Sequence, residues 1–221
     1  MTRINFENEL TNLKHMVIRM AESVQNAIEQ ATRALVAKDY ELAAKIIKED
    51  DLIDKMEIEI EDTCIQLIVT QQPMASDMRL IFTINKIAVD LERIGDYAHS
   101  ISKLNIKMKD EVYMKRFVNL EKMSEICVKM IRSAIDAFIK NDLELAQKIY
   151  DMDDELDDIY HEIFTELMSY VIMDPKNIAQ AMNLLLIARY YERTGDHTQN
   201  ICEWVYFNKQ GKRLSDPEEV I

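Results

Sequence analysis

Apolar residues recur at spacings of three and four along almost the whole 221-residue chain. One such stripe consists of Leu42, Ile46, Ile53, Met56, Ile60 and Leu67. A second consists of Leu145, Ile149, Leu156, Ile159, Ile163 and Leu167. Residues at these spacings share one face of an α-helix, and the strict alternation typical of half-buried strands is absent. The pattern therefore predicts an all-α protein whose helices pack together along their apolar faces.

Few positions interrupt these stripes, since the chain has only 3 glycines and 3 prolines. Asp39 and Asp142 stand where one helix ends and the next begins, and both are suitable N-cap residues. Pro73 and Pro175 suit the first position of a new helix. A link between two halves is expected near residues 105–112. These signals predict six long antiparallel helices at about residues 6–37, 40–71, 74–105, 112–140, 143–172 and 176–208.

The sequence repeats itself after about one hundred residues. The segment "LERIGDYAHSI" (91–101) is matched by "YERTGDHTQNI" (191–201), which places Gly95 and Gly195 at the same point of the repeat. A glycine within a helix costs about 1 kcal/mol relative to alanine, so a repeated one indicates close packing or function.

The second helices of the two halves repeat as well. "KDYELAAKIIKEDDLID" (38–54) is matched by "NDLELAQKIYDMDDELD" (141–157) at an offset of 103 residues. An internal duplication of this length predicts two similar three-helix bundles. We place them at residues 1–107 and 108–210 and expect a frayed C-terminal tail at residues 211–221.

Each half carries two pairs of acidic residues at i,i+4 spacing. The pairs are Asp50 with Asp54, Glu92 with Asp96, Asp153 with Asp157, and Glu192 with Asp196. Residues four apart lie on one helix face, so each half could gather four carboxylates between its second and third helices. Carboxylate oxygens suit Mg²⁺, Mn²⁺, Ca²⁺ or iron, and a cation would offset the repulsion between them. The sequence thus predicts metal binding at these eight residues, and the other interpretation is a solvated acidic surface.

Histidines and arginines near these pairs have more than one interpretation. We interpret His99 and His161 as incidental surface residues, because the Glu-x-x-His motif of di-iron bundles is absent from the sequence. His197 is a candidate additional ligand. Arg93 and Arg193 either form ion pairs with a carboxylate on a neighbouring helix or orient a metal-binding carboxylate.

Composition narrows the classes of function. The formal net charge of −13 disfavours nucleic acid as a partner. The three cysteines, Cys64, Cys127 and Cys202, lie in apolar patterns and are expected to be buried thiols in a reducing compartment. We see neither a secretory leader nor an apolar run of the ~18 residues that a membrane span requires. These features predict a cytoplasmic protein.

The doubled ERxGD motif, with "DDLID" at 50–54 and "DDELD" at 153–157, resembles the PhoU family of accessory regulators of bacterial phosphate-specific transport. The resemblance spans about residues 5–208. It implies two three-helix bundles related by pseudo-twofold symmetry. It also implies that the eight acidic residues bind iron or zinc, as clusters or single ions, with magnesium or manganese as further possibilities.

The same resemblance implies a function without catalysis, and we find no nucleophile elbow, P-loop or dinucleotide fingerprint in the sequence. Family members are typically dimeric adaptors between the ATPase subunit of the phosphate ABC transporter and a phosphate-sensing histidine kinase. The resemblance therefore implies that the chain reaches a membrane only indirectly, through these partners. Members of the family repress phosphate-starvation genes when phosphate is plentiful. Two other functions stay open at this point: a carboxylate-bridged di-metal oxidase on a helical bundle, and a metal-free helical scaffold.

The two copies of the motif differ next to their acidic pairs. Asp90 precedes the first motif, whereas Tyr190 takes its place in the second. Asn200 follows the second motif, whereas the first has Ser100. We therefore expect the two metal sites to differ in nuclearity or affinity, with the second the weaker because of Tyr190.

Overall fold

The computed structural model describes residues 3–114 and 117–212, and within those ranges the chain forms helices and no strand. The elements are α1 (Arg3–Ala37), α2 (Tyr40–Gln71), α3 (Ala75–Lys107), α4 (Val118–Lys140), α5 (Leu143–Tyr150), α6 (Asp153–Met173), the 3₁₀ helix η1 (Pro175–Asn177) and α7 (Ile178–Gln210). This confirms the all-α prediction. Within the described ranges, each helix is too short or too polar to cross a membrane.

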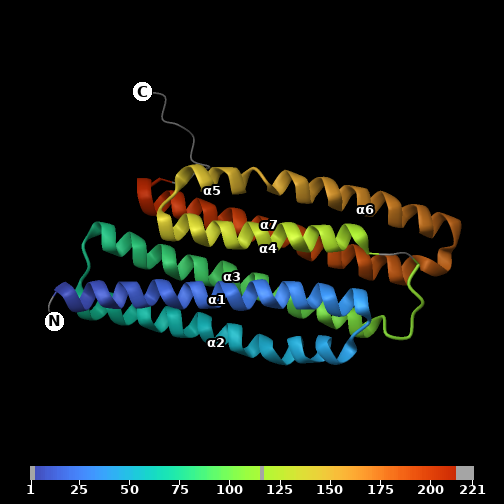
Figure 1. Cartoon of the computed structure of the whole chain (residues 1–221), viewed down its shortest axis with the longest axis horizontal. Coiled ribbons are helices and arrows are strands. Elements are labelled where there is room, and N and C mark those ends of the chain that lie inside the picture. Colours follow the sequence, from blue (N-terminus) through green and yellow to red (C-terminus); the bar gives the residue numbers. More distant parts are fainter. Residues whose placement is uncertain (1–2, 115–116, 213–221) are drawn as a thin grey trace, which may run out of the picture.

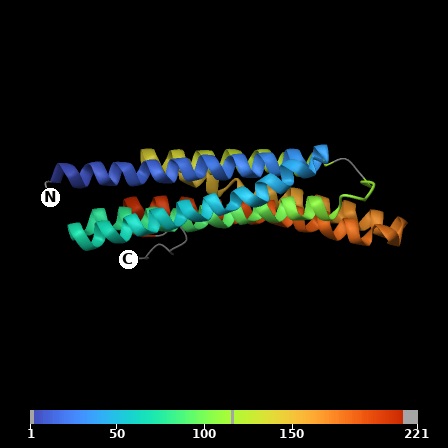
Figure 2. The same ribbon diagram turned by 90° about the horizontal axis from the view of Figure 1, so that it is seen from below.

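The two halves pack side by side along their third helices (Figure 1). α3 and α7 run antiparallel along the middle of the molecule, and α1 packs against both α3 and α4. α2 lies on one outer flank, and α5 and α6 lie on the other (Figures 1 and 2). The predicted pair of similar three-helix bundles is confirmed, although the middle helix of the second bundle is in two pieces.

Local sequence signals explain most helix ends. The Asp39 side chain accepts a hydrogen bond from the Leu42 amide at 2.9 Å, and Asp142 accepts one from the Leu145 amide at 3.0 Å. Both predicted N-caps are therefore confirmed, and they satisfy amides that have no partner within the helix. Gly211 ends α7 in the left-handed conformation, with φ of 73°. The rest of the predicted tail, residues 213–221, lies outside the described residues.

Two predicted helix starts are wrong. Pro73 lies two residues before α3, although Pro175 does begin η1. α4 begins at Val118, six residues later than expected. The chain before α4 is held on α7 by Gln180, which accepts a hydrogen bond from the Met114 amide at 2.7 Å and donates to Glu111 at 2.8 Å. These contacts with α7 hold residues 111–114 outside a helix, where the prediction places the start of α4.

The predicted helix 143–172 is interrupted at Asp151 and Met152, where α5 ends and α6 begins. No glycine or proline marks this break in the sequence. The Met152 amide donates to the Ile149 carbonyl at 3.0 Å, a tighter bond than the i−4 bond of an α-helix. The Tyr150 carbonyl instead accepts a hydrogen bond from the Gln199 side chain at 2.9 Å, so a residue of α7 stabilises the break.

The predicted apolar stripes form a continuous core through both halves. Cys64, Cys127 and Cys202 are buried free thiols, as the sequence indicated. Tyr191 is fully buried, and its hydroxyl lies 2.7 Å from Thr32 Oγ1, which also donates to Ser124 at 2.7 Å. This hydroxyl cluster joins α1, α4 and α7 and fixes how the two halves fit together.

Candidate metal centre

The structure brings the four acidic residues of the second half close to one another. This second acidic cluster consists of Asp153 and Asp157 on α6 and Glu192 and Asp196 on α7. Asp153 is the first residue of α6, directly after the helix break, and only 6% of it is exposed. Glu192 is 7% exposed, whereas Asp157 is exposed and Asp196 is half-buried. The predicted i,i+4 geometry therefore produces one partly enclosed group of carboxylates.

Two of these carboxylates hold buried oxygens without a hydrogen-bond partner, namely Asp153 Oδ1 and Glu192 Oε2. A β-carbon placed on Gly195 would lie only 2.0 Å from Asp153 Oδ1, so the glycine makes room for this carboxylate. Burial, reinforced by the charges of Asp196, Asp157 and Glu192, raises the pKa of Asp153 to about 7. Burial and Asp196 likewise raise the pKa of Glu192. Asp153 thus lies among negative charges with one oxygen unpartnered, whereas Glu192 also has a positively charged neighbour, Arg189.

The first acidic cluster consists of Asp50 and Asp54 on α2 and Glu92 and Asp96 on α3. Burial, then Asp50 and Asp96, raises the pKa of Asp54, and burial, then Asp96, raises that of Glu92. These four residues therefore also lie within electrostatic range of one another. The difference from the second cluster is that buried Asp50 is hydrogen-bonded to the imidazole of His99.

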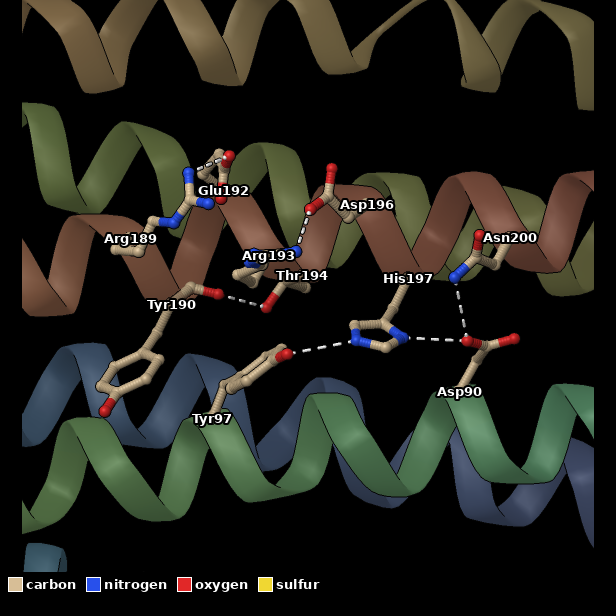
Figure 3. A network of polar contacts seen from close by, with 10 residues as sticks. All are labelled: Asp90, Tyr97, Arg189, Tyr190, Glu192, Arg193, Thr194, Asp196, His197 and Asn200. Atoms are coloured by element: carbon tan, nitrogen blue, oxygen red, sulfur yellow. Dashed lines mark hydrogen bonds and ion pairs between the residues drawn. The ribbon is translucent and has the colours of Figure 1, made fainter.

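Arginines pair with these carboxylates from the same helix. Arg93 lies 3.3 Å from Asp96, and Arg193 lies 3.1 Å from Asp196, each three residues along. The expected ion pair with a neighbouring helix is therefore replaced by a pair within α3 and within α7. Arg189 forms a similar close pair with Glu192 (Figure 3). Any cation that binds here must displace these guanidinium groups or share the carboxylates with them.

The donor set can be tested for its fit to a metal ion. In the described part of the chain, no group of three or more His, Cys, Asp or Glu side chains is already arranged to hold an ion. Asp153 Oδ1 and Glu192 Oε2 nevertheless provide buried acceptors without a hydrogen-bond partner, which a hard cation would satisfy. The second acidic cluster thus fits a cation better than the first, where His99 already satisfies Asp50.

Polar residues of the two halves meet along the contact between α3 and α7 (Figure 3). His197 Nδ1 lies 2.9 Å from Asp90 Oδ1, and its other ring nitrogen lies 3.1 Å from the Tyr97 hydroxyl. Asp90 also accepts hydrogen bonds from Asn200 and Trp204, both at 3.2 Å. These contacts hold α3 against α7 between the two acidic clusters.

The contact between α3 and α7 is built from positions that correspond to each other in the two repeats. Asp90 and His197 form one pair, and the residues that replace them in the other copy, Tyr190 and Tyr97, form another. The two tyrosine rings stack with centroids 5.6 Å apart. Asp90 therefore serves the contact between halves, and its replacement by Tyr190 gives no reason to expect a weaker second metal site.

Sequence reasoning missed two roles. Half-buried His99 holds Asp50, so its interpretation as an incidental surface residue is wrong, whereas His161 is exposed as expected. His197 contacts Asp90 rather than an acidic cluster. The signal for this contact was present in the repeat, because positions 90 and 97 and their copies at 190 and 197 change together between the halves.

A family model described as the PhoU domain matches residues 17–104 and again residues 120–205. Each match lies within one of the two predicted repeats.

Curated proteins with similar sequences carry related names. The phosphate-specific transport system accessory protein PhoU homolog of Aquifex aeolicus (strain VF5) is 46% identical over 185 residues, which cover 84% of either chain. The phosphate-specific transport system accessory protein PhoU of Escherichia coli (strain K12) is 33% identical over 207 residues. That alignment covers 94% of this chain and 86% of the relative.

Two crystal structures share the fold. PhoU from Pseudomonas aeruginosa is 34% identical with a TM-score of 0.89, and the match covers 94% of this chain and 100% of that one. The phosphate transport system regulatory protein PhoU from Streptococcus pneumoniae is 27% identical, also with a TM-score of 0.89. That match covers 96% of this chain and 100% of the other.

Proposed function

The chain belongs to the PhoU family, and we propose that it is a cytoplasmic, non-enzymatic regulator of phosphate uptake and of the phosphate-starvation response. The observation that carries this proposal is the family match over both repeats, at residues 17–104 and 120–205. The relatives from Aquifex aeolicus and Escherichia coli are named as accessory proteins of phosphate-specific transport and align over most of the chain. An accessory role agrees with the repeated motifs of the sequence, which contain acidic residues but no catalytic nucleophile motif.

The regulator would act as a homodimeric adaptor between the ATPase subunit of the phosphate ABC transporter and a phosphate-sensing histidine kinase. Exposed apolar side chains at two distant ends support contacts with more than one protein. One group surrounds the turn from α2 to α3 and comprises Val69, Met74 and Met78. The other surrounds the turn from α6 to α7 and comprises Ile172, Met173 and Ile178. Figure 1 shows these turns at opposite ends of the molecule.

Metal binding would occur at the acidic clusters, with the second cluster as the stronger candidate. Its support is the pair of buried, unpartnered oxygens on Asp153 and Glu192. A bound cation would bond these oxygens and offset the repulsion among the carboxylates of the cluster. Iron, zinc, magnesium and manganese are the candidates, since the oxygen donors do not select strongly among hard and borderline ions.

The regulatory role is tested by deleting the gene and restoring it with variants. Deletion should change phosphate uptake or raise expression of phosphate-starvation genes at high phosphate, and unchanged behaviour would contradict the proposal. Glu192→Gln should fail to restore regulation if the cation matters. Asp158→Asn, on an exposed position of α6 outside the cluster, is the matched control and should restore it.

Metal content is measured separately, by elemental analysis of protein purified without chelator and then reloaded. We expect bound metal in the wild type and less metal in Glu192→Gln. Metal no higher than in a chelator-treated sample, even after reloading, would refute the metal component. The regulatory proposal would then rest on the deletion experiment alone.

A further inference from the structure

A partly enclosed cavity of about 220 Å³ lies between α1 and α2 in the first half. Its α1 wall includes Ser23 and Ala27, and its α2 wall includes Ile46, Asp50 and Ile53. The cavity is next to the first acidic cluster but extends away from it along the apolar contact between the two helices. It shares Asp50 with the first acidic cluster, and its other lining residues belong to neither the metal candidates nor the contact between halves.

The duplication explains why this cavity exists. Ser23 and Ala27 correspond, at the offset of 103 residues, to Ile126 and Met130 in the second half. Ile126 and Met130 are buried, with 8% and 0% exposure, whereas Ser23 and Ala27 are only partly buried. The second half thus has large buried side chains at the two positions where small residues line the cavity in the first. Since protein interiors are normally close-packed, a cavity at positions where the other repeat has large buried side chains is a candidate ligand site.

The cavity combines an apolar floor with acceptor groups. Ile46, Ile53 and Ala27 supply the floor, and Glu49 and Asp50 supply carboxylates on the α2 side. Glu49 is exposed and pairs only loosely with Lys45, at 3.5 Å, so another cation could replace that partner. Asp50 keeps its contact with His99 and adds negative charge.

The opposite wall also offers an acceptor. Gln30 donates its amide to Asn26 Oδ1 at 2.7 Å, which leaves the Gln30 carbonyl oxygen outside that bond. Carboxylates and an amide carbonyl around an apolar floor favour a ligand with a hydrocarbon body and a positively charged donor. An anion would meet repulsion from Glu49 and Asp50.

We propose that this α1–α2 cavity binds a small organic cation. Its ammonium group lies against Glu49 and Asp50, and its short hydrocarbon chain lies on Ala27, Ile46 and Ile53. The volume is below the roughly 300–1,000 Å³ of sites for drug-sized molecules, which restricts the ligand to a few carbon atoms beyond its ammonium group. Because Asp50 also belongs to the first acidic cluster, a metal ion bound there would compete with this ligand. The proposal does not depend on the phosphate-regulatory role.

The test uses three probes of equal length and different charge: hexylammonium, 1-hexanol and hexanoate. Binding to the full chain is followed by NMR of isoleucine δ1 methyl groups in buffer containing chelator. Hexylammonium should shift the signals of Ile46 and Ile53 saturably, and should bind about threefold to fivefold more tightly than hexanol. Hexanoate should bind more weakly than either. No saturable shift with hexylammonium, or equal affinity for all three probes, would overturn the proposal.

Ala27→Met tests the location, because it places in the cavity the side chain that the second half carries as Met130. Hexylammonium binding should fall by roughly tenfold or more as the cavity is filled. Ala179→Met, at an exposed position on α7, is the matched control and should leave binding unchanged. Ser23→Ile provides a second filling variant if Ala27→Met does not fold. Unchanged binding by a folded filling variant would refute the site.

Discussion

Gly195→Ala is the substitution that tests most directly how the second acidic cluster is built. A β-carbon at this position would lie 2.0 Å from Asp153 Oδ1 and 2.7 Å from Leu156 Cδ1, far inside the 3.4 Å of ordinary contact. At Gly95 the nearest atom is Ile53 Cγ2, at 3.1 Å, and a small shift of this side chain relieves the contact. The two glycines thus provide a matched pair at the same point of the repeat.

The expected magnitudes follow from two opposing effects. Alanine in a helix interior is favoured over glycine by about 1 kcal/mol. Overpacking a filled site costs about 1–3 kcal/mol, because the buried side chains of Asp153 and Leu156 must both move. Gly195→Ala should therefore lower the free energy of unfolding by up to about 2 kcal/mol. Gly95→Ala should change it by less than about 0.5 kcal/mol or raise it slightly.

The assay is urea unfolding followed by circular dichroism at pH 7.5 with chelator present. A double-mutant cycle with Asp153→Ala assigns the cause, since removal of the carboxylate should eliminate most of the penalty at position 195. If Gly195→Ala proves as stable as Gly95→Ala, Asp153 does not occupy the space above Gly195. An unchanged penalty in the Asp153→Ala background would assign the clash to Leu156 instead.

Three further predictions concern polar groups. Burial first, and Asp196 second, raise the pKa of Asp153 to about 7. The folded state therefore retains a proton that the unfolded chain releases, and metal-free stability should fall as pH rises from about 4 to about 7 and then level off. Asp153→Asn should flatten this slope and raise unfolding free energy at pH 7.5 by about 1–3 kcal/mol; an unaltered slope would contradict the assignment. Gln199→Ala should cost about 1 kcal/mol and speed amide hydrogen exchange around the break after Tyr150, and unchanged exchange would show that α7 does not stabilise the break. Tyr191→Phe should lower thermal stability by about 1 kcal/mol through loss of the bond to Thr32, and an unaltered melting temperature would refute that role.

The helices themselves were predictable because their determinants are local. Apolar spacing, the N-caps Asp39 and Asp142, and the scarcity of glycine and proline act within a few residues of one another. The errors occur where distant segments compete with helical geometry. Gln180 of α7 holds the chain before α4, and Gln199 of α7 satisfies the carbonyl at the break between α5 and α6. Neither contact leaves a local pattern.

The grouping of the acidic residues into two clusters was also predictable from the sequence. The i,i+4 spacing places each pair on one face, and the duplication indicates that the pairs of one half belong together. The different states of the clusters were not predictable, because they depend on contacts between helices. His99 satisfies Asp50 in the first half, whereas Asp153 in the second has a buried oxygen without a partner.

The sequence by itself determined the all-α fold, the duplicated bundles, the family and the positions of the acidic pairs, since each depends on periodicity or repetition along the chain. The tertiary structure decided which carboxylates are compensated, where the long helix breaks and which repeat keeps a cavity. It also assigned Asp90 to the contact between halves rather than to a metal site. These properties depend on side chains brought together across helices, where the size of one residue, such as Ala27 or Met130, changes what its neighbours can do.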